Sequence, residues 1–275
     1  MPGPGGVKAL FKEADEAYRD GFYLRALAVY EKITELKPAD RDAWFQKALT
    51  LQQLGKYEKA ASAYERIVCM DAKDEPAWLN LGSICGSLGR HDQAIECFDK
   101  VLELNPNSES ALCNKGLALS SWGSNEKAIS AFDMVLMINR SNDQALISKG
   151  LALSAMGRHA EALVCFNEAL TLRPDDTECL NNIALEYTDM GQDAKALRCY
   201  AKILKLNPQD FRALAFRGLI QMKRKQWRSA RISMKKALAV SQQARQEQKV
   251  PQDVTNIIEL ALQSLDNGSK KKKGG

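Results

Sequence analysis

The stretch Glu75–Ser108, EPAWLNLGSICGSLGRHDQAIECFDKVLELNPNS, decides how the whole chain is organised. It contains two amphipathic segments, one around Trp78 and one around Phe98. Gly89 separates these segments and Pro106 closes the unit. The same pattern returns every 34 residues along the sequence. A repeat of this length is one small unit that buries its apolar face only by stacking on its neighbours.

Seven copies of the pattern follow one another without insertion or deletion. They begin at Val7, Arg41, Glu75, Glu109, Asp143, Thr177 and Phe211. Residue 20 of every copy is alanine. Residue 24 is large in every copy: Tyr30, Tyr64, Phe98, Phe132, Phe166, Tyr200 and Met234. A small residue one helical turn before a large one favours a pair of helices that cross closely.

The ends of the expected helices carry matching signals. Residue 34 of the first six copies is a good N-cap type: Asp40, Asp74, Ser108, Asn142, Asp176 and Asp210. The side-chain oxygens of such residues can accept hydrogen bonds from the free N–H groups of the next helix. Residue 15 of the same copies is glycine, which suits a helix-ending turn with positive φ. Each copy is therefore predicted to be a helix–turn–helix.

The repeated unit resembles the tetratricopeptide repeat family, whose motif is W-x2-L-G-x2-Y, then A-x3-F, then P. The matching residues are Trp78, Leu81, Gly82, Ala94, Phe98 and Pro106. The resemblance covers 7–244 in the units 7–40, 41–74, 75–108, 109–142, 143–176, 177–210 and 211–244. It implies an all-α fold, a right-handed α-solenoid superhelix of seven helix–turn–helix repeats. It also implies that partners bind the concave surface that the first helices line.

The two ends of the chain depart from this pattern. In the last copy Lys225 replaces the turn glycine and Gln242 replaces the proline, so its second helix is expected to run on. Residues 252–265 place apolar side chains on one helical face and are expected to cap the last repeat. The first six residues and the lysine-rich 266–275 are expected to be disordered.

The composition and the motifs disfavour several functional classes. The sequence contains no apolar run of about 18 residues and no signal peptide, so we expect a cytoplasmic chain without membrane contact. No P-loop, HExxH motif or nucleophile elbow is present, so neither an enzyme nor a cofactor is expected. His91 and His159 share residue 17 of their copies, where a structural role is favoured.

The cysteines favour packing over metal or disulfide chemistry. The chain has seven of them, and no two form a CxxC pair. Cys97, Cys165 and Cys199 share one position of the repeat, as small apolar residues of a core would. Zinc sites need clustered ligands at short spacing, so no metal site is predicted.

A row of polar side chains is the first candidate binding site. Residue 6 of five consecutive copies is an amide or a hydroxyl: Gln46, Asn80, Asn114, Ser148 and Asn182. An amide can both donate to and accept from a peptide group, so such a row would hold an extended backbone. The row is similar to the asparagine ladder in the repeat region of O-linked N-acetylglucosamine transferase. Amides are also common on exposed helices, and both explanations stay open.

Residue 9 adds leucine beside this row, at Leu117, Leu151 and Leu185. These leucines form an apolar stripe on the groove or pack between neighbouring first helices, and packing is slightly favoured. Residues 12 and 13 of the middle copies are small or polar: Gly86, Ser87, Ser120, Ser121, Ser154 and Ala155. A groove left open in this way suits an extended peptide or a helix of a partner protein. The chain is therefore predicted to be a non-catalytic adaptor.

One type of partner is disfavoured. Repeats of this family that dock the C-terminal tails of chaperones use lysine and asparagine at residues 5 and 9 of a copy. Here residue 5 is apolar at Leu79, Cys113 and Ile147, and residue 9 is apolar at Leu117. No three consecutive copies rebuild the carboxylate clamp, so chaperone tails are not expected to bind.

The basic C-terminal end is the second candidate site. Residues 1–210 carry 24 Lys and Arg against 30 Asp and Glu, whereas 211–249 carry 11 basic residues and one acid. Seven of these cations are crowded together: Lys223, Arg224, Lys225, Arg228, Arg231, Lys235 and Lys236. The alternative function is nucleic-acid or ribonucleoprotein binding through this end. Trp227 shares its repeat position with Tyr57 and is expected to pack. A solvated basic cap that aids solubility is the favoured explanation of the charge.

Overall fold

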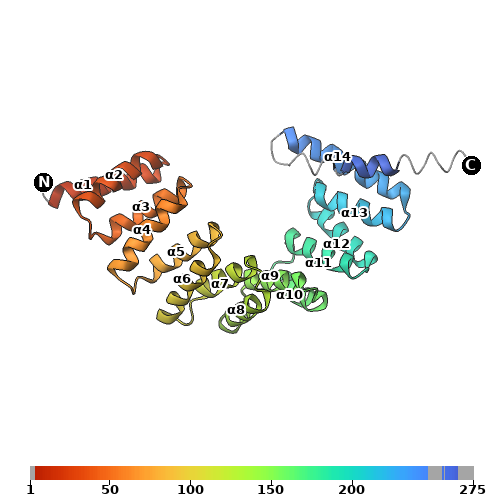
Figure 1. The fold of residues 1–275 in the computed structure, drawn as a ribbon. Helices are drawn as coiled ribbons and strands as arrows, with labels where there is room; N and C mark the ends of the chain where they lie inside the picture. The colour runs from red at the N-terminus through yellow and green to blue at the C-terminus, as the bar shows by residue number, and fades with distance from the viewer. Residues whose placement is uncertain (1–3, 247–255, 257, 266–275) are drawn as a thin grey trace, which may run out of the picture. The chain divides into compact units, whose positions relative to one another are not determined.

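The computed structural model describes residues 4–246, 256 and 258–265, all of which are helical or lie in short turns (Figure 1). The helices are α1 Pro4–Arg19, α2 Tyr23–Leu36, α3 Arg41–Gln53, α4 Tyr57–Met70, α5 Glu75–Ser87, α6 His91–Leu104, α7 Glu109–Ser121, α8 Asn125–Ile138, α9 Asp143–Ala155, α10 His159–Leu172, α11 Thr177–Asp189, α12 Asp193–Leu206, α13 Phe211–Lys223 and α14 Trp227–Gln246. Each expected copy is one helix–turn–helix, so the predicted all-α repeat fold is confirmed.

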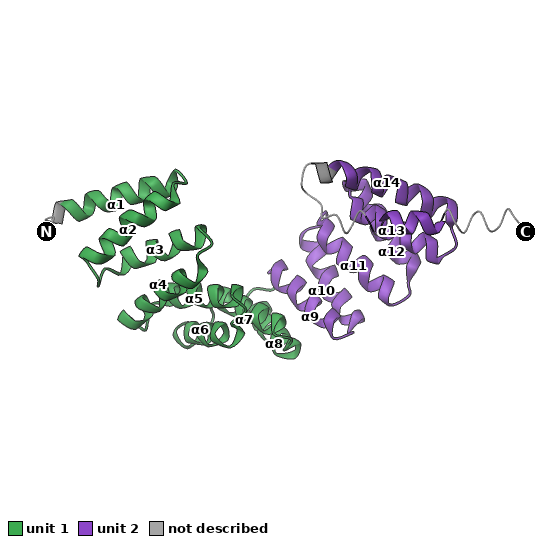
Figure 2. Ribbon diagram, turned by 45° about the horizontal axis from the view of Figure 1, so that its top comes forward, with its two compact units in different colours: residues 1–140 green, residues 141–275 purple. Residues whose placement is uncertain are grey.

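The contacts divide the chain into two compact units, Met1–Arg140 and Ser141–Gly275, which Figure 2 colours separately. Unit 1 contains α1 to α8, and unit 2 contains α9 to α14 with the helical residues 258–265. Inside each unit the two helices of a copy pack on each other, and the second helix packs on the first helix of the next copy. The candidate residues are therefore positioned within one unit or the other.

The predicted N-caps hold the starts of the first helices. Asp40 accepts a hydrogen bond from the Ala43 N–H at 3.1 Å, and Asp210 accepts one from the Ala213 N–H at 2.9 Å. The four caps between them bond in the same way. Helix α1 begins at Pro4, three residues before the expected start of the first copy. Proline suits the first turn of a helix, because the N–H that it lacks would have no partner there.

The turns inside the copies have the predicted left-handed conformation. The glycines at residue 15 have φ between 68° and 84°. Lys225 replaces glycine in the last copy and still adopts φ 60°, alone among the non-glycine residues that the structure describes. The turn geometry is therefore imposed by the packing of α13 and α14, at some cost to an L-residue.

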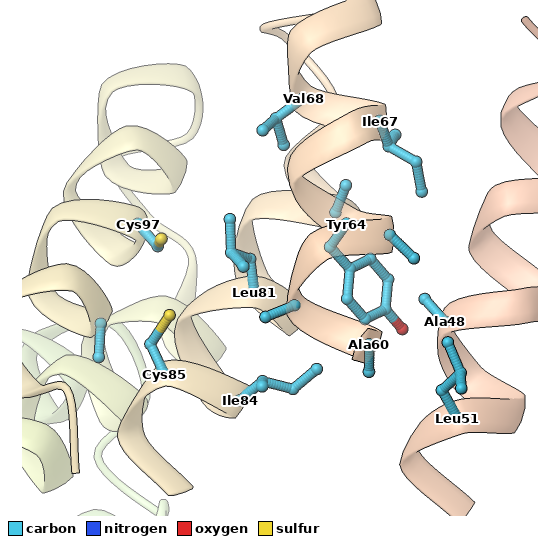
Figure 3. Packing of buried hydrophobic residues seen from close by; sticks show 14 of the residues in the cluster. Ala48, Leu51, Ala60, Tyr64, Ile67, Val68, Leu81, Ile84, Cys85 and Cys97 are labelled. Carbon is cyan, nitrogen blue, oxygen red and sulfur yellow. The ribbon is translucent and has the colours of Figure 1, made fainter. Parts of the chain in front are cut away.

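The core of each copy lies where the two helices cross. The alanine at residue 20 is fully buried in all seven copies, and so is the large side chain one turn later. Figure 3 shows one such side chain, Tyr64 of α4, between Leu51 of α3 and Ile84 of α5. The repeated alanine thus allows the close crossing that the sequence predicts.

The last copy is covered by the C-terminal residues. Helix α14 continues to Gln246, as the loss of the closing proline predicts. Residues 258–265 are also helical, and Ile258 and Leu265 are buried against Leu214 and Met234. This contact covers the apolar face that a terminal repeat would otherwise expose.

A bidentate ion pair joins the first and last residues of the copy 41–74 in unit 1. The Arg41 guanidinium donates from Nε to Asp74 Oδ2 at 2.6 Å and from Nη2 to Asp74 Oδ1 at 3.0 Å. Asp74 also caps α5 by accepting from the Ala77 N–H at 2.9 Å. The hydrogen bonds from Arg41 lower the pKa of the Asp74 carboxyl, burial opposes this shift, and the bond from Ala77 adds to it.

We expect Arg41→Ala to lower the free energy of unfolding of unit 1 by about 1–2 kcal/mol at pH 7, because it removes the two hydrogen bonds to the Asp74 carboxylate. The effect is no larger because Arg41 is partly exposed and solvent screens the pair. A carboxyl whose pKa is lowered in the folded state stabilises the fold above its unfolded pKa and loses that effect as the pH falls. The difference between the two proteins should therefore shrink below about pH 4. Urea unfolding at pH 7 and pH 3 measures it. An equal difference at both pH values would contradict the assignment.

Candidate functional site

The first-helix face of unit 1, meaning the surface of α3, α5 and α7 that carries residues 6 and 9 of each copy, holds three amides. Gln46, Asn80 and Asn114 are all partly exposed there. The Asn80 Nδ2 donates to the Pro76 carbonyl of its own helix at 2.8 Å. The Asn114 Nδ2 lies 3.4 Å from the Ser83 Oγ, which links α7 to α5. Each of these two amides retains its carbonyl oxygen and one N–H for a ligand.

The row is less regular in unit 2. Ser148 is 5% exposed, and its hydroxyl accepts a hydrogen bond from the Gln144 Nε2 at 3.3 Å. Asn182 of α11 is partly exposed and has no hydrogen-bond partner among the described residues. Residue 6 of the last copy is Phe216, which stacks on Tyr200 with ring centroids 5.9 Å apart. Of the two polar side chains at residue 6 in this unit, only Asn182 is partly exposed, as the amides of unit 1 are.

The leucines at residue 9 lie on the surface more than the sequence indicates. Leu117 is 43% exposed and Leu151 is 47% exposed, whereas Leu185 is partly buried. The slightly favoured packing between neighbouring first helices therefore does not account for Leu117 or Leu151. Leu117 on α7 and Leu151 on α9 instead expose an apolar side chain beside the polar row.

A hollow of about 290 Å³ opens on the first-helix face of unit 1, between α5 and α7. We call it the Gly86 hollow. It is lined by Gly82, Ser83, Gly86 and Ser87 of α5, His91 and Phe98 of α6, and Asn114, Leu117, Ala118 and Ser121 of α7. Apolar groups of α6 and α7 thus share the hollow with hydroxyls and one amide of the candidate row.

The two glycines that line the hollow have different reasons to be glycine. A Cβ on Gly82 would lie 2.7 Å from the Phe98 ring, so packing excludes a side chain there. A Cβ on Gly86 would meet only the Ala94 Cβ, at 4.0 Å. The φ of Gly86 is not positive, and a glycine inside a helix costs up to about 1 kcal/mol relative to alanine. Neither packing nor backbone geometry requires Gly86.

The basic residues near the C-terminus do not all face solvent. Lys223 pairs with Asp193 at 3.0 Å, and the Arg231 Nη2 donates to the Leu265 carbonyl at 3.3 Å. Lys223 is exposed all the same, as are Arg224, Lys225, Arg228, Lys235 and Lys236. Trp227 is 48% exposed, so its expected packing is only partial. Two of the seven predicted cations thus have structural partners.

The histidines begin second helices, as their repeat position predicts. His91 is the first residue of α6, and its Nδ1 is buried without a hydrogen-bond partner. His159 is the first residue of α10, and its Nδ1 lies 2.8 Å from the Oε2 of Glu186. The Glu186 side chain is only 3% exposed, and His159 is its one side-chain partner in the described part of the chain. Sequence reasoning missed this pair, because the partners lie in different copies.

Four of the seven cysteines are buried in the core: Cys85, Cys97, Cys165 and Cys179. Cys113 and Cys199 are partly buried, and Cys69 is exposed. None of the seven, all of which lie in the described residues, forms a disulfide, and Cys85 and Cys97 lie with their side chains pointing toward each other (Figure 3). Their mutual hydrogen bond raises the pKa of the Cys97 thiol, and burial raises it further. Among the described residues, no three His, Cys, Asp or Glu side chains cluster as metal ligands would. In the same residues, no helix is both long and apolar enough to cross a bilayer.

Family models agree with the repeat pattern. Two models described as tetratricopeptide repeat match residues 11–77 and 76–108. A third, described as the N-terminal TPR repeats region of Psidin, matches residues 118–237. No curated protein matches the chain.

Solved structures show the same fold. A tetratricopeptide repeat protein from Parabacteroides merdae is 19% identical, with 94% of this chain and 98% of that chain covered and a TM-score of 0.69. The C-terminal part of a TPR protein from Cytophaga hutchinsonii is 17% identical, with coverages of 84% and 95% and a TM-score of 0.70. YrrB, described as a TPR protein with an unusual peptide-binding site, is 20% identical, with coverages of 67% and 95% and a TM-score of 0.55. At these identities the likeness shows the fold.

Proposed function

Because the chain is built from tetratricopeptide repeats and belongs to that family, we propose that it is a protein-interaction scaffold that binds an extended peptide of a partner protein. The proposed site is the first-helix face of unit 1. The observation that carries the proposal is the pair Asn80 and Asn114, whose amide nitrogens donate to groups of the chain while their oxygens accept no hydrogen bond from the described residues.

The chemistry of this face suits a peptide backbone. A peptide in extended conformation presents N–H and C=O groups that a folded helix would use internally. The amide oxygens of Asn80 and Asn114 can accept from such N–H groups, and their remaining N–H groups can donate to carbonyls. Leu117, exposed beside Asn114, adds apolar contact for a side chain of the bound segment. The YrrB structure, described as having a peptide-binding site, supports the same class of ligand.

We expect the variant Asn80→Ala/Asn114→Ala to bind such peptides about thirtyfold more weakly than the wild type. Each amide contributes about 1 kcal/mol per net hydrogen bond, and about 2 kcal/mol corresponds to this change in Kd. Random peptides displayed on phage are selected on the full chain, and fluorescence anisotropy then gives the Kd of each selected peptide for both proteins.

The control variant is Asn107→Ala, which removes an exposed amide in the turn after α6, away from this face. It should bind the selected peptides as the wild type does. Circular dichroism should show equal helix content in all three proteins, because Asn80 and Asn114 lie on the surface. Equal Kd values for the wild type and the double variant would refute the proposed site.

Nucleic-acid binding through the basic end is the weaker candidate. Lys223 and Arg231 already interact with Asp193 and with the Leu265 carbonyl. The exposed half of Trp227 is the feature that favours it, since bases stack on such rings.

A further inference from the structure

We propose that the Gly86 hollow is a specificity pocket that receives one large apolar side chain of the bound peptide. This inference rests on the proposed function, because it places the pocket inside the peptide-binding face of unit 1. It goes further by naming the side-chain chemistry that the site selects and the residue, Gly86, that permits it.

The size of the hollow fits such a side chain. Its volume is about 290 Å³. A cavity of about 150 Å³ lined by apolar side chains is enough to bind benzene. The Gly86 hollow can therefore accept a ring or a branched aliphatic group of the size of phenylalanine or leucine. Smaller side chains would leave much of the lining in contact with water.

The lining of the hollow combines apolar and polar groups. Phe98 and Ala118 are buried in the core and contribute apolar atoms to the lining, to which His91 of α6 adds its imidazole ring. Ser83, Ser121 and Asn114 lie on the first-helix face, where a peptide backbone would pass. Pockets that recognise a ligand commonly combine an apolar interior with a few polar groups that fix orientation.

Gly86 lines the hollow without placing a side chain of its own in it. Residue 12 of the next two copies is Ser120 and Ser154, so the loss of the side chain is specific to this copy. A Cβ on Gly86 would meet no atom closer than 4.0 Å. The glycine is thus unfavourable for the helix and unnecessary for packing, and its consequence is the space that a side chain at residue 86 would occupy in the lining of the hollow. A larger residue here would fill the pocket with the chain's own side chain.

The test uses peptides selected from a random phage-displayed library on the full wild-type chain. We expect the selected sequences to share one phenylalanine, leucine or other large apolar residue. Gly86→Leu should weaken their binding tenfold or more, while its melting temperature stays equal or rises, because leucine is a good helix former. Gly86→Ser, which copies the neighbouring repeats, should bind within a few fold of the wild type.

A peptide whose shared apolar residue is changed to alanine tests whether that side chain occupies the Gly86 hollow. It should bind the wild type at least tenfold more weakly and should no longer distinguish the wild type from Gly86→Leu. Two results distinguish a failure of the pocket from a failure of the proposed function. Peptides that depend on Asn80 and Asn114 but bind Gly86→Leu normally would overturn the pocket and retain the proposed function. Peptides that are indifferent to all of these substitutions, or the recovery of none, would overturn both.

Discussion

His159→Ala should lower the free energy of unfolding of unit 2 by about 3–5 kcal/mol at neutral pH. The substitution removes the partner whose Nδ1 lies 2.8 Å from the Glu186 Oε2. The Glu186 side chain is 3% exposed and that of His159 is 32% exposed, so water only partly replaces the lost interaction. A buried carboxylate without a partner is among the most destabilising features that a single substitution can create.

Glu186→Ile is the matched control, because the same repeat position holds buried isoleucine at Ile84 and Ile220. Replacing a buried charge by an apolar residue of suitable size is often neutral or stabilising. We therefore expect Glu186→Ile to change stability by less than about 1 kcal/mol. In that background His159→Ala should cost little, because no carboxylate remains to be left unpaired.

Hydrogen exchange of α10 and α11, together with urea unfolding of the four proteins, measures this cycle. Hydrogen exchange is included because stacked repeats can unfold locally, a few helices at a time. A change at the interface of α10 and α11 is therefore measured most directly in those two helices. If His159→Ala costs the same with glutamate and with isoleucine at residue 186, the carboxylate is not the source of the effect.

Most of the fold was predictable from the sequence, because each of its parts depends on residues close together in the chain. Asp40 caps α3 by accepting from the N–H of Ala43, three residues further along the chain. Gly89 adopts φ 72° in the turn that follows α5. The buried alanines and large residues recur at fixed spacing, so one copy predicts the others. The start of α1 at Pro4 was not predicted, because no preceding copy supplies a cap that marks it.

The candidate site was predictable only in part, because exposure depends on packing between copies. The sequence places Asn80 and Ser148 at the same repeat position, yet Asn80 is partly exposed and Ser148 is buried. Ser148 is smaller than an amide side chain and bonds to Gln144. Sequence reasoning identified Gly86 as one of several small residues. The distances from a Cβ to its neighbours are what distinguish it from Gly82.

The crossing of α9 and α10 provides the second large effect. Phe166 is fully buried, and a Cβ on Gly150 would lie 2.6 Å from its ring. Phe166→Ala should lower the free energy of unfolding of unit 2 by about 3–5 kcal/mol, through lost burial and the cavity that remains. Gly150→Ala in the wild type should cost about 1–2 kcal/mol, because the clash with the ring exceeds the gain in helix propensity.

The two substitutions together should show a change of sign. Once Phe166 is alanine, the added methyl group on residue 150 meets no ring and occupies part of the cavity. Gly150→Ala should then stabilise unit 2 by about 1 kcal/mol, since alanine favours the helix over glycine. Urea unfolding of the four proteins gives the coupling between the sites. A cost for Gly150→Ala in both backgrounds would mean that the Phe166 ring is not what requires glycine at residue 150.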